Sequence, residues 1–292
     1  MEKVTVRVPA TSANIGPAFD CAGIAFSLYN VFSFEKLESG VEFENFEDQY
    51  TGKDNLAYVA YKAACDAIGV KSDVKITSVD INVPFARGLG SSATLVCAGV
   101  VAANLLNGKK LTDNELLEIA NSIEGHPDNV DPALFGGLCA SVICDGKPVT
   151  VKFNVSDKIY FTALIPNFEV KTSDARAALP GSYCRKDVIF NMSRTALLPY
   201  AFEKGNFELI KTVTQDKIHE QYRKRLFKNI DEVEKIAYSM GAVSFFISGA
   251  GSTCMCISSK PIYNELNEKL KNIENEWIAY PLEVDNQGTK EV

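Results

Sequence analysis

The sequence predicts a two-domain α+β protein, and three observations support this prediction. The chain has 292 residues, about twice the ~150 residues of a common single domain. Apolar residues make up 46% and charged residues 23%, as in ordinary globular proteins, which excludes a disordered or fibrous chain. Strand and helix patterns mix in the first half, and the second half contains a strand–turn–strand–helix–strand order typical of an antiparallel sheet covered by helices.

Periodicity and capping residues locate the elements of the first half. Alternating apolar and polar residues predict strands, whereas apolar residues at helical spacing that end at Gly69 predict a helix. Thr112 and Glu115 form a capping box that opens a later helix, and the nearly all-apolar helix before it is expected in the core. In chain order we expect strands at 4–8 and 28–36, a helix at 55–68, a strand at 74–83, helices at 93–106 and 112–123, and strands at 138–144 and 149–155 around a turn at 145–148.

The second half is expected to begin near residue 156. No long linker or low-complexity tract marks the boundary, and we divide the chain into domains 1–155 and 156–292. In chain order we expect a strand at 159–165, helices at 187–203, 207–216 and 230–239, strands at 242–247 and 253–258 on either side of a Gly-rich turn, a helix at 262–273 and a strand at 277–284.

Charge and composition exclude several functions. With 30 basic and 37 acidic residues the net charge is -7, so we expect neither nucleic acid nor an anionic membrane as a partner. The longest apolar stretch, 93–106, is shorter than the ~20 residues that cross a bilayer, and the N-terminus has no apolar signal-peptide core. Eight cysteines without a C-x-x-C pair indicate reduced, mostly buried thiols in a cytoplasmic protein, and two histidines nearly exclude a multi-histidine metal site.

The most informative stretch is a Gly-rich loop that opens the apolar helix, PFARGLGSSATLVCAGVVAANLL. Gly88 and Gly90 allow close approach of the backbone to a ligand, because no Cβ is in the way. Ser91 and Ser92 come at the helix start, where free N–H groups and the helix dipole favour a phosphate. The loop lacks the G-x-x-x-x-G-K-[ST] pattern, and its G-x-G-x-x-A match to the dinucleotide fingerprint is followed by another helix instead of a second parallel strand. We therefore predict a phosphate-binding loop of another kind.

Two further stretches concentrate polar residues. VPATSANIGPAFD offers Asn14 and Asp20 after a strand, but these residues alone favour an Asx-rich turn. EGHPDNVDPALFGG is expected to be a polar loop, and its carboxylates would suit Mg²⁺ through one or two ligands. A lone histidine such as His126 is more often structural than functional.

Glycines and arginines of the second half complete the candidates. Gly249 and Gly251 lie in FFISGAGSTCMCIS between two strands, where a tight hairpin turn is the simpler explanation. Arg176 and Arg223 are candidates for binding a carboxylate, because arginine pairs with it through two hydrogen bonds. Solvated surface arginines are the alternative for both.

Taken in order along the chain, these stretches resemble the GHMP kinases, a superfamily that includes galactokinases, homoserine kinases and mevalonate kinases. VPATSANIGPAFD and EGHPDNV are most similar to the motifs of the homoserine kinases, whereas ARGLGSSA and SGAGST fit the superfamily. The resemblance implies ATP-dependent phosphorylation of the hydroxyl of L-homoserine, a step of threonine biosynthesis. It also implies an N-terminal domain like domain 2 of ribosomal protein S5, a ferredoxin-like C-terminal domain and a homodimer.

The resemblance assigns roles to individual residues. Ser92 and Glu124 would hold Mg²⁺, and together with Asn129 they would be the catalytic residues. The nucleotide would be bound by Asn55, Pro84, Phe85, Ala86, Arg87, Gly88, Leu89, Gly90, Ser91, Ser92, Ala93 and Thr94. The amino acid would be bound by Asn14, Asp20, His126, Asn129, Thr172, Arg176, Arg223 and Gly249, with Asp20 at its ammonium group and the two arginines at its carboxylate.

Three positions depart from the family pattern. Ala18 stands where glycine is usual, and would cost about 1 kcal/mol if the turn required a positive φ there. Ser252 replaces a usual proline. Asp131 replaces a usual alanine and is expected to add a charge near the substrate pocket.

The expected mechanism is mainly alignment and charge neutralisation, as phosphoryl transfer requires. No general base is evident, since Asn129 cannot accept a proton, so we expect the hydroxyl proton to pass to a phosphate oxygen or to water.

A kinase for another alcohol is the nearest alternative function, but mevalonate or a sugar would not need a site for an ammonium group together with a site for a carboxylate. A non-catalytic nucleotide-binding regulator is the second alternative, and the intact Glu124 and loop serines favour an enzyme.

Overall fold

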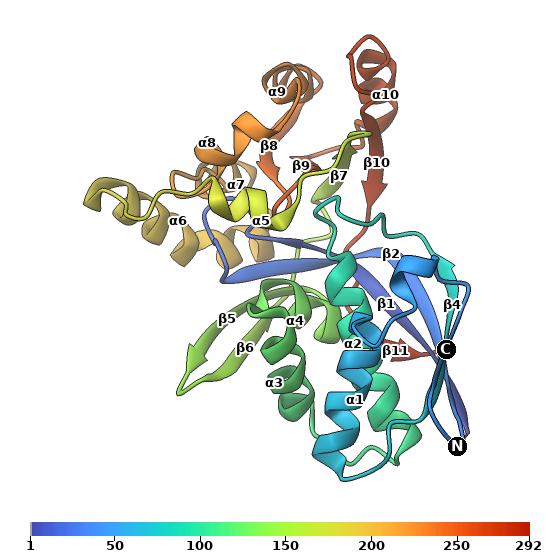
Figure 1. The fold of residues 1–292 in the computed structure, drawn as a ribbon. Helices are drawn as coiled ribbons and strands as arrows, with labels where there is room; N and C mark the ends of the chain where they lie inside the picture. Colours follow the sequence, from blue (N-terminus) through green and yellow to red (C-terminus); the bar gives the residue numbers. More distant parts are fainter. Residues whose placement is uncertain (1) are drawn as a thin grey trace.

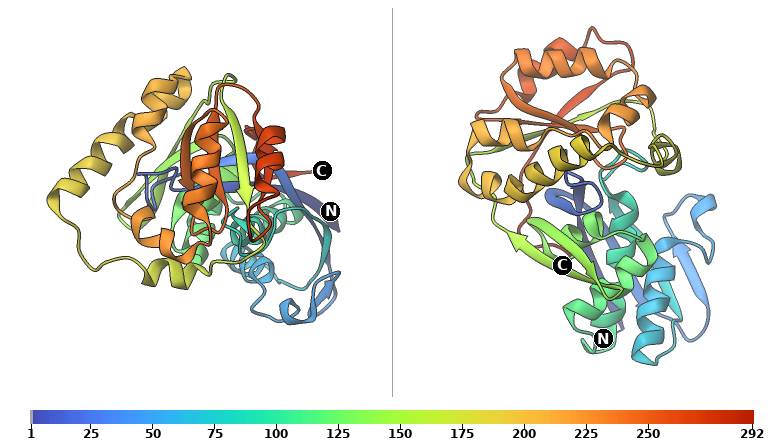
Figure 2. Two further views of the ribbon diagram at one scale, coloured as in Figure 1. Left: turned by 90° about the horizontal axis from the view of Figure 1, so that it is seen from above. Right: turned by 90° about the vertical axis from the view of Figure 1, so that its left-hand side faces the viewer.

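The computed structural model describes residues 2–292 as two β-sheets with helices packed on them. Figure 1 shows helices α1 to α4 gathered on one face of the first sheet. In the second view of Figure 2 the later half of the chain is stacked above the earlier half. No helix among residues 2–292 has both the length and the apolar character needed to span a bilayer.

The first sheet is built around one long strand, β2, which pairs with β1, β4 and β5. All its strand pairs are antiparallel except β3 with β4. Its strands are β1 (Lys3–Ala13), β2 (Ala22–Lys36), β3 (Val41–Glu44), β4 (Val74–Ile81), β5 (Leu138–Cys144), β6 (Lys147–Phe153) and β11 (Lys290–Glu291). Because β11 pairs with β1, the end of the chain returns to the first sheet. The division of the chain at residue 155 stays a prediction. It assigns β11 to the second domain, although this strand pairs with β1 of the first sheet.

The helices of the first half follow their capping residues. Asn55 caps α1 by accepting a hydrogen bond from the Ala57 N–H, and Gly69 ends the helix in the left-handed conformation. The capping box of Thr112 and Glu115 is present at α3. The helices are η1 (Asp48–Tyr50), α1 (Leu56–Ile68), α2 (Ser91–Leu106), α3 (Asp113–Glu124) and α4 (Pro127–Phe135). Their apolar faces and one face of the sheet enclose a core in which most of α2 is buried, as its composition predicts.

The second sheet has the strand order β10–β7–β9–β8, with all neighbours antiparallel. This spatial order (fourth, first, third, second) confirms the ferredoxin-like arrangement expected for the second half. Its strands are β7 (Tyr160–Ile165), β8 (Ala242–Ile247), β9 (Cys254–Ser258) and β10 (Ile278–Leu282). The helices are α5 (Thr172–Ala177), α6 (Arg185–Lys204), α7 (Phe207–Val213), α8 (Glu220–Arg223), η2 (Lys224–Leu226), α9 (Ile230–Ser239) and α10 (Tyr263–Leu270).

A second hydrophobic core joins the two sheets. Phe26 of β2 contacts Phe161 of β7 edge to face, with ring centroids 5.1 Å apart. Ile15, in the turn between β1 and β2, is buried in the same cluster as Phe246 of β8. The two halves are therefore held together beside that turn, which brings the polar stretches of both halves to one place.

Two local predictions were wrong in an informative way. The stretch expected to be a polar loop forms helix α4, with Pro127 at its first position and Val130, Ala133 and Leu134 buried on its inner side. The turn expected at 145–148 is only the two residues Asp145 and Gly146, both with positive φ, as in a tight hairpin. Five of the eight cysteines are buried, as expected.

Candidate active site

A cavity lies between the two halves, and most of the predicted site residues line it. The first half contributes residues from the β1–β2 turn, the Gly-rich loop, the end of α3 and the start of α4. The second half contributes residues from α5, α8 and the β8–β9 turn. The lining residues are Ala13, Asn14, Asp20, Ala86, Gly88, Gly90, Ser91, Ser92, Glu124, His126, Asp128, Asn129, Val170, Thr172, Arg176, Arg223, Gly249, Ala250 and Gly251.

One wall of the cavity is the N-terminus of α2. Gly90 precedes the helix with a φ of 72° and no side chain caps it, so the first N–H groups of the helix have no side-chain acceptor. A Cβ on Gly90 would lie 2.0 Å from the Thr11 Oγ1 atom, so only glycine fits the approach of the loop to β1. Ser91 and Ser92 line the cavity at this point. Free N–H groups at the positive end of a buried helix favour a phosphate.

The Gly-rich loop is held by the β8–β9 turn of the other half. The Ser248 hydroxyl donates to the Gly88 carbonyl at 2.6 Å, and the Thr253 N–H donates to the Arg87 carbonyl at 2.9 Å. The hairpin expected from the glycines of this turn is confirmed by the antiparallel pairing of β8 with β9. The turn thus serves both as a hairpin and as a support for the Gly-rich loop.

Ser92 and Glu124 lie side by side at the cavity wall. The Ser92 hydroxyl donates to the Glu124 carboxylate at 2.7 Å. Burial raises the pKa of Glu124, and the Ser92 hydrogen bond only partly opposes this effect. A carboxylate and a hydroxyl in contact, facing a phosphate-binding helix end, are the hard oxygen donors that Mg²⁺ prefers. The two residues therefore fit the Mg²⁺ that the resemblance to the GHMP kinases assigns to them.

The start of α4 presents three polar side chains to the cavity. The His126 Nδ1 atom is 2.5 Å from the Asp128 carboxylate, and this hydrogen bond raises the pKa of His126. The Asn129 carboxamide oxygen accepts a hydrogen bond from the buried Thr11 hydroxyl at 2.8 Å. Neither Thr11 nor Asp128 was among the predicted site residues, although Asp128 lines the cavity and fixes the histidine ring.

The side of the cavity that we expect to bind the amino acid, called the amino-acid side below, contains an internal ion pair. Arg176 donates two hydrogen bonds to Asp20, at 3.0 and 3.1 Å, and the pair is partly exposed. Opposite roles were expected for these residues, at the carboxylate and at the ammonium group of one ligand, yet here they bind each other. The hydrogen bonding of Arg176 to the Asp20 carboxylate is also the largest cause of the raised pKa of Arg176. Thr172 lies one helical turn before Arg176 on α5 and lines the same cavity.

Arg223 is the most unusual charge in the cavity. Its side chain is 2% exposed, and its guanidinium donates to the Gly249 carbonyl at 2.8 Å and to the Ala175 carbonyl at 3.3 Å. It stacks over the Phe19 ring at 5.0 Å. Among residues 2–292 no carboxylate forms an ion pair with it. A buried cation that lines a cavity and lacks an anionic partner favours an anionic ligand.

The β1–β2 turn holds the remaining predicted residues. The Asn14 carboxamide donates to the Gly249 carbonyl at 3.0 Å and accepts from the Asp20 N–H at 3.0 Å, so Asn14 ties the turn to the other half of the molecule. Ala18 is buried and is not among the residues with positive φ. The strain considered for Ala18 is therefore absent, and the left-handed conformations of this turn fall on Asn14, Ile15, Gly16 and Asp20 instead.

The other two departures from the family pattern lie away from the cavity lining. Asp131 was expected near the substrate pocket, but it points from α4 toward the β5–β6 hairpin, where the Ser141 and Thr150 hydroxyls donate to it. Burial raises its pKa to about 6. The Ser252 hydroxyl donates to the Phe168 carbonyl at 2.5 Å, inside the second half.

A second cavity adjoins the first at Ser91 and Ser92. Asn55 lines it, although its side chain also caps α1 and donates to the Tyr50 carbonyl at 2.7 Å. The rings of Tyr50 and Phe85 stack in its wall, with centroids 5.7 Å apart. The aromatic wall was not predicted around Tyr50, since no sequence pattern marks that residue. A flat apolar wall next to a phosphate-binding helix end suits a nucleotide base.

Five residues of the Gly-rich loop and its helix line neither cavity: Pro84, Arg87, Leu89, Ala93 and Thr94. Leu89 and Ala93 are buried in hydrophobic clusters. The Thr94 hydroxyl donates to the Ser91 carbonyl and accepts from Asn30. Arg87 forms an ion pair with Glu169 across the two halves at 3.4 Å. The nucleotide-binding role expected for these five residues stays a prediction.

Comparison with known proteins identifies the class of enzyme. Residues 55–137 match the family model of the GHMP kinases N terminal domain, and residues 200–273 match that of the GHMP kinases C terminal domain. The first match spans the Gly-rich loop, Ser92 and Glu124, and the second spans Arg223 and the β8–β9 turn. The fold and the site are thus those of a GHMP kinase, an enzyme class that uses ATP.

Full-length relatives narrow the class. A homoserine kinase of Clostridium botulinum (strain Langeland) is 43% identical over 289 residues, which cover 98% of this chain and 97% of that protein. A homoserine kinase of Clostridium beijerinckii is 42% identical with the same coverage. The crystal structure of a homoserine kinase from Cytophaga hutchinsonii superposes with a TM-score of 0.91 at 27% identity, covering all of this chain and 98% of that one. This chain belongs to the homoserine kinases of the GHMP kinase superfamily.

Proposed function

We propose that this enzyme transfers the γ-phosphoryl group of ATP to the hydroxyl of L-homoserine, which yields O-phospho-L-homoserine and ADP within threonine biosynthesis. The observation that carries the proposal is the buried Arg223, which lacks a carboxylate partner and lines the cavity that Asp20 and the N-terminus of α2 also line. A ligand for this cavity should offer a carboxylate, a cation and a group that reacts with a phosphate. The full-length similarity to homoserine kinases supports the same substrate.

The amino acid is proposed to replace the internal ion pair. Its ammonium group would bind Asp20, and its carboxylate would bind Arg176 and Arg223. Ion pairs between partly exposed side chains are worth only about 0–1 kcal/mol, so the Asp20–Arg176 pair exchanges readily for a zwitterion that satisfies both partners. Side-chain atoms of Asp20, His126 and Asp128, one oxygen or nitrogen from each, lie within 4.8 Å of one another, so the Asp128 carboxylate adds negative charge beside the proposed ammonium position.

ATP is proposed to span both cavities, with its phosphates at the start of α2 and its base against Tyr50 and Phe85. The free N–H groups of α2 would bind the phosphates through the helix end. Ser92 and Glu124 would hold Mg²⁺, which supplies charge neutralisation on the phosphates when bound. Because Ser91 and Ser92 line both cavities, they are the point where nucleotide and amino acid would meet.

Proton removal from the hydroxyl is proposed to need no dedicated base. Asn129 cannot accept a proton, and the Asp128 carboxylate is already bound to His126. Asn129, fixed by Thr11, would instead orient the hydroxyl in line with the phosphate. The proton would pass to a phosphate oxygen or to water.

The proposal includes the homodimer and the cytoplasmic location that the sequence led us to expect. A solution mass of twice the 31.9 kDa chain, measured by light scattering, would support the dimer, and a mass of one chain would refute it.

ADP release from MgATP tests the proposed reaction. The purified protein is given L-homoserine, L-serine, L-threonine, mevalonate and galactose in separate assays. Turnover largely confined to L-homoserine is expected, because only amino acids carry both charges and only L-homoserine adds the longer hydroxyl arm. Turnover on mevalonate or galactose instead would refute the amino-acid assignment. Absence of turnover with every acceptor would refute the kinase activity itself.

A further inference from the structure

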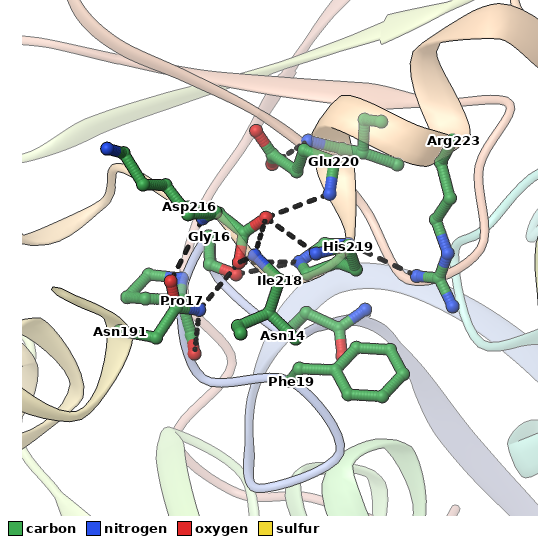
Figure 3. Close-up of polar contacts among 12 residues, drawn as sticks. Asn14, Gly16, Pro17, Phe19, Asn191, Asp216, Ile218, His219, Glu220 and Arg223 are labelled. Carbon is green, nitrogen blue, oxygen red and sulfur yellow. Dashed lines mark hydrogen bonds and ion pairs between the residues drawn. The ribbon is translucent and has the colours of Figure 1, made fainter. Parts of the chain in front are cut away.

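A buried polar cluster lies directly behind Arg223, and no motif of the sequence analysis included it. Figure 3 shows His219 between the Gly16 backbone and the Arg223 guanidinium. The His219 side chain is fully buried. Its Nε2 atom is 2.8 Å from the Gly16 carbonyl, and its Nδ1 atom is 3.3 Å from Arg223 Nη1. The imidazole therefore connects two parts of the site: the β1–β2 turn, which carries Asp20, and Arg223 on the opposite side.

The two hydrogen bonds define the protonation state of His219. A guanidinium only donates hydrogen bonds, so the Nδ1 atom facing Arg223 must be the acceptor. The Nε2 atom faces a carbonyl, which only accepts, so the proton is on Nε2. Burial also lowers the pKa of His219, which favours the neutral ring. A proton on Nδ1 would face the arginine with a second donor, and a ring protonated on both nitrogens would add a second charge.

Asp216 holds His219 and the start of α8 in place. Its carboxylate accepts hydrogen bonds from the N–H groups of Ile218, His219 and Glu220, and from the Asn191 side chain on α6 (Figure 3). These contacts fix the short helix whose last residue is Arg223. Asn191 also donates to the Pro17 carbonyl at 3.0 Å, so the cluster has a second connection to the β1–β2 turn.

From these contacts we infer that His219 is a positioning residue for substrate binding: it holds the Arg223 guanidinium in register with the Asp20 turn, so that one L-homoserine molecule reaches both. The inference rests on the proposed function, because it assumes that Arg223 binds the substrate carboxylate. His219 itself does not line the cavity. Its effect should appear in the binding of the amino acid and not in the binding of ATP.

Steady-state kinetics of two variants test the inference. His219→Leu removes both hydrogen bonds, and is expected to raise the KM for L-homoserine at least tenfold while the KM for ATP stays within twofold. His219→Gln keeps an acceptor and a donor. Its KM for L-homoserine is therefore expected to rise by at most half as much as that of His219→Leu, when both rises are expressed as logarithms. 3-Aminopropan-1-ol, which lacks the carboxylate, serves as a competitive inhibitor whose inhibition constant should be equal in both variants and the wild type.

Each outcome of the kinetics separates positioning from folding. A loss of folded protein lowers the apparent kcat but leaves both KM values unchanged, so a KM for L-homoserine within twofold of the wild type in His219→Leu would overturn the inference. An equal weakening of 3-aminopropan-1-ol binding would overturn it too, because the effect would then not pass through the carboxylate site. Failure of the wild type to phosphorylate L-homoserine would instead refute the proposed function, and this inference with it.

A measurement on the wild-type protein covers the case in which His219→Leu does not fold. The chain has only two histidines, so their ¹⁵N ring resonances can be assigned by comparison with His219→Gln. We expect a neutral His219 ring with the proton on Nε2, and a shift of its Nδ1 resonance when L-homoserine binds. A proton on Nδ1, or resonances unaffected by L-homoserine, would overturn the inference.

Discussion

The phosphate side and the amino-acid side of the cavity are built in opposite ways. The phosphate side is local: one loop and the first turn of α2 offer backbone N–H groups, and nearby small residues allow the close approach. The amino-acid side is assembled from residues far apart in the chain, such as Asp20 and Arg176, which are 156 positions apart. We propose that its specificity resides in side-chain charges and in the buried contacts that orient them.

This difference indicates which part of the site sets the class of reaction and which part sets the substrate. A helix end with free N–H groups binds any phosphate, so the α2 side suits every kinase of the superfamily. The amino-acid side depends on two arginines and a carboxylate that converge only in the folded protein. Changes on the first side should reduce the rate with every acceptor, whereas changes on the second side should affect the amino acid alone.

The largest effect is expected from the phosphate side. Glu124→Gln removes the charged oxygen next to Ser92, and should lower kcat by about a hundredfold or more with little change in the KM for L-homoserine. Glu118→Gln, at a partly exposed position paired with Lys147, is the matched control and should be neutral. A decrease in kcat of less than threefold for Glu124→Gln in an ADP-release assay would contradict the metal-binding role.

The next largest effect is expected from the amino-acid side. Arg223→Met removes the buried cation, and should raise the KM for L-homoserine about a hundredfold while the KM for ATP stays the same. Arg185→Met, which changes an exposed arginine at the start of α6, is the control. Equal changes in both KM values would indicate that the two sides are not separate.

A smaller effect is expected where the two sides meet. Asn129→Ala removes the orienting carboxamide and leaves the Thr11 hydroxyl without its partner, and should lower kcat by about tenfold through misalignment. Rates are compared at saturating ATP and L-homoserine. If Asn129→Ala lost as much activity as Glu124→Gln, an alignment role would be too modest for Asn129.

No effect on activity is expected at Asp131, whose neighbours are Ser141 and Thr150 and not the cavity. Its pKa is raised by burial from 3.8 to about 6, so the folded protein loses stability as pH rises from about 4 to about 6, and the loss is complete above that. Asp131→Asn should raise the free energy of unfolding by at most about 3 kcal/mol at pH 8, and by less at pH 5. Thermal unfolding midpoints at the two pH values measure this, with Asp157→Asn at an exposed site as the control. If the unfolding midpoint of Asp131→Asn differed from that of the wild type by the same amount at both pH values, the raised pKa of Asp131 would be contradicted.

The same contrast explains how much of the molecule could be predicted from the sequence. Helix α1 between Asn55 and Gly69 and the capping box of α3 were predictable, because short-range capping and periodicity determine them. The Gly-rich loop that opens α2 was predictable for the same reason. Helix α4 was missed because its polar first turn hid the signal of Pro127 and of the buried Val130, Ala133 and Leu134.

Contacts between distant segments were beyond prediction from one sequence. The pairing of Asp20 with Arg176 and the bridge of His219 to Gly16 depend on how the two halves meet, which no local pattern encodes. The location of Asp131 was wrong for a similar reason: its position in the GHPDNVD segment suggested the pocket, but the helix turns it to the opposite side. Tyr50 was missed because a stacked aromatic wall has no sequence signature.

The most direct test of the account compares L-homoserine with two acceptors that each lack one charge. 4-Hydroxybutanoate lacks the ammonium group that Asp20 would bind, and 3-aminopropan-1-ol lacks the carboxylate that Arg176 and Arg223 would bind. The account predicts that kcat/KM in an ADP-release assay decreases at least a hundredfold for each, with an unchanged KM for ATP. Values within tenfold of that for L-homoserine for either acceptor would contradict the claim that the cavity recognises a zwitterion.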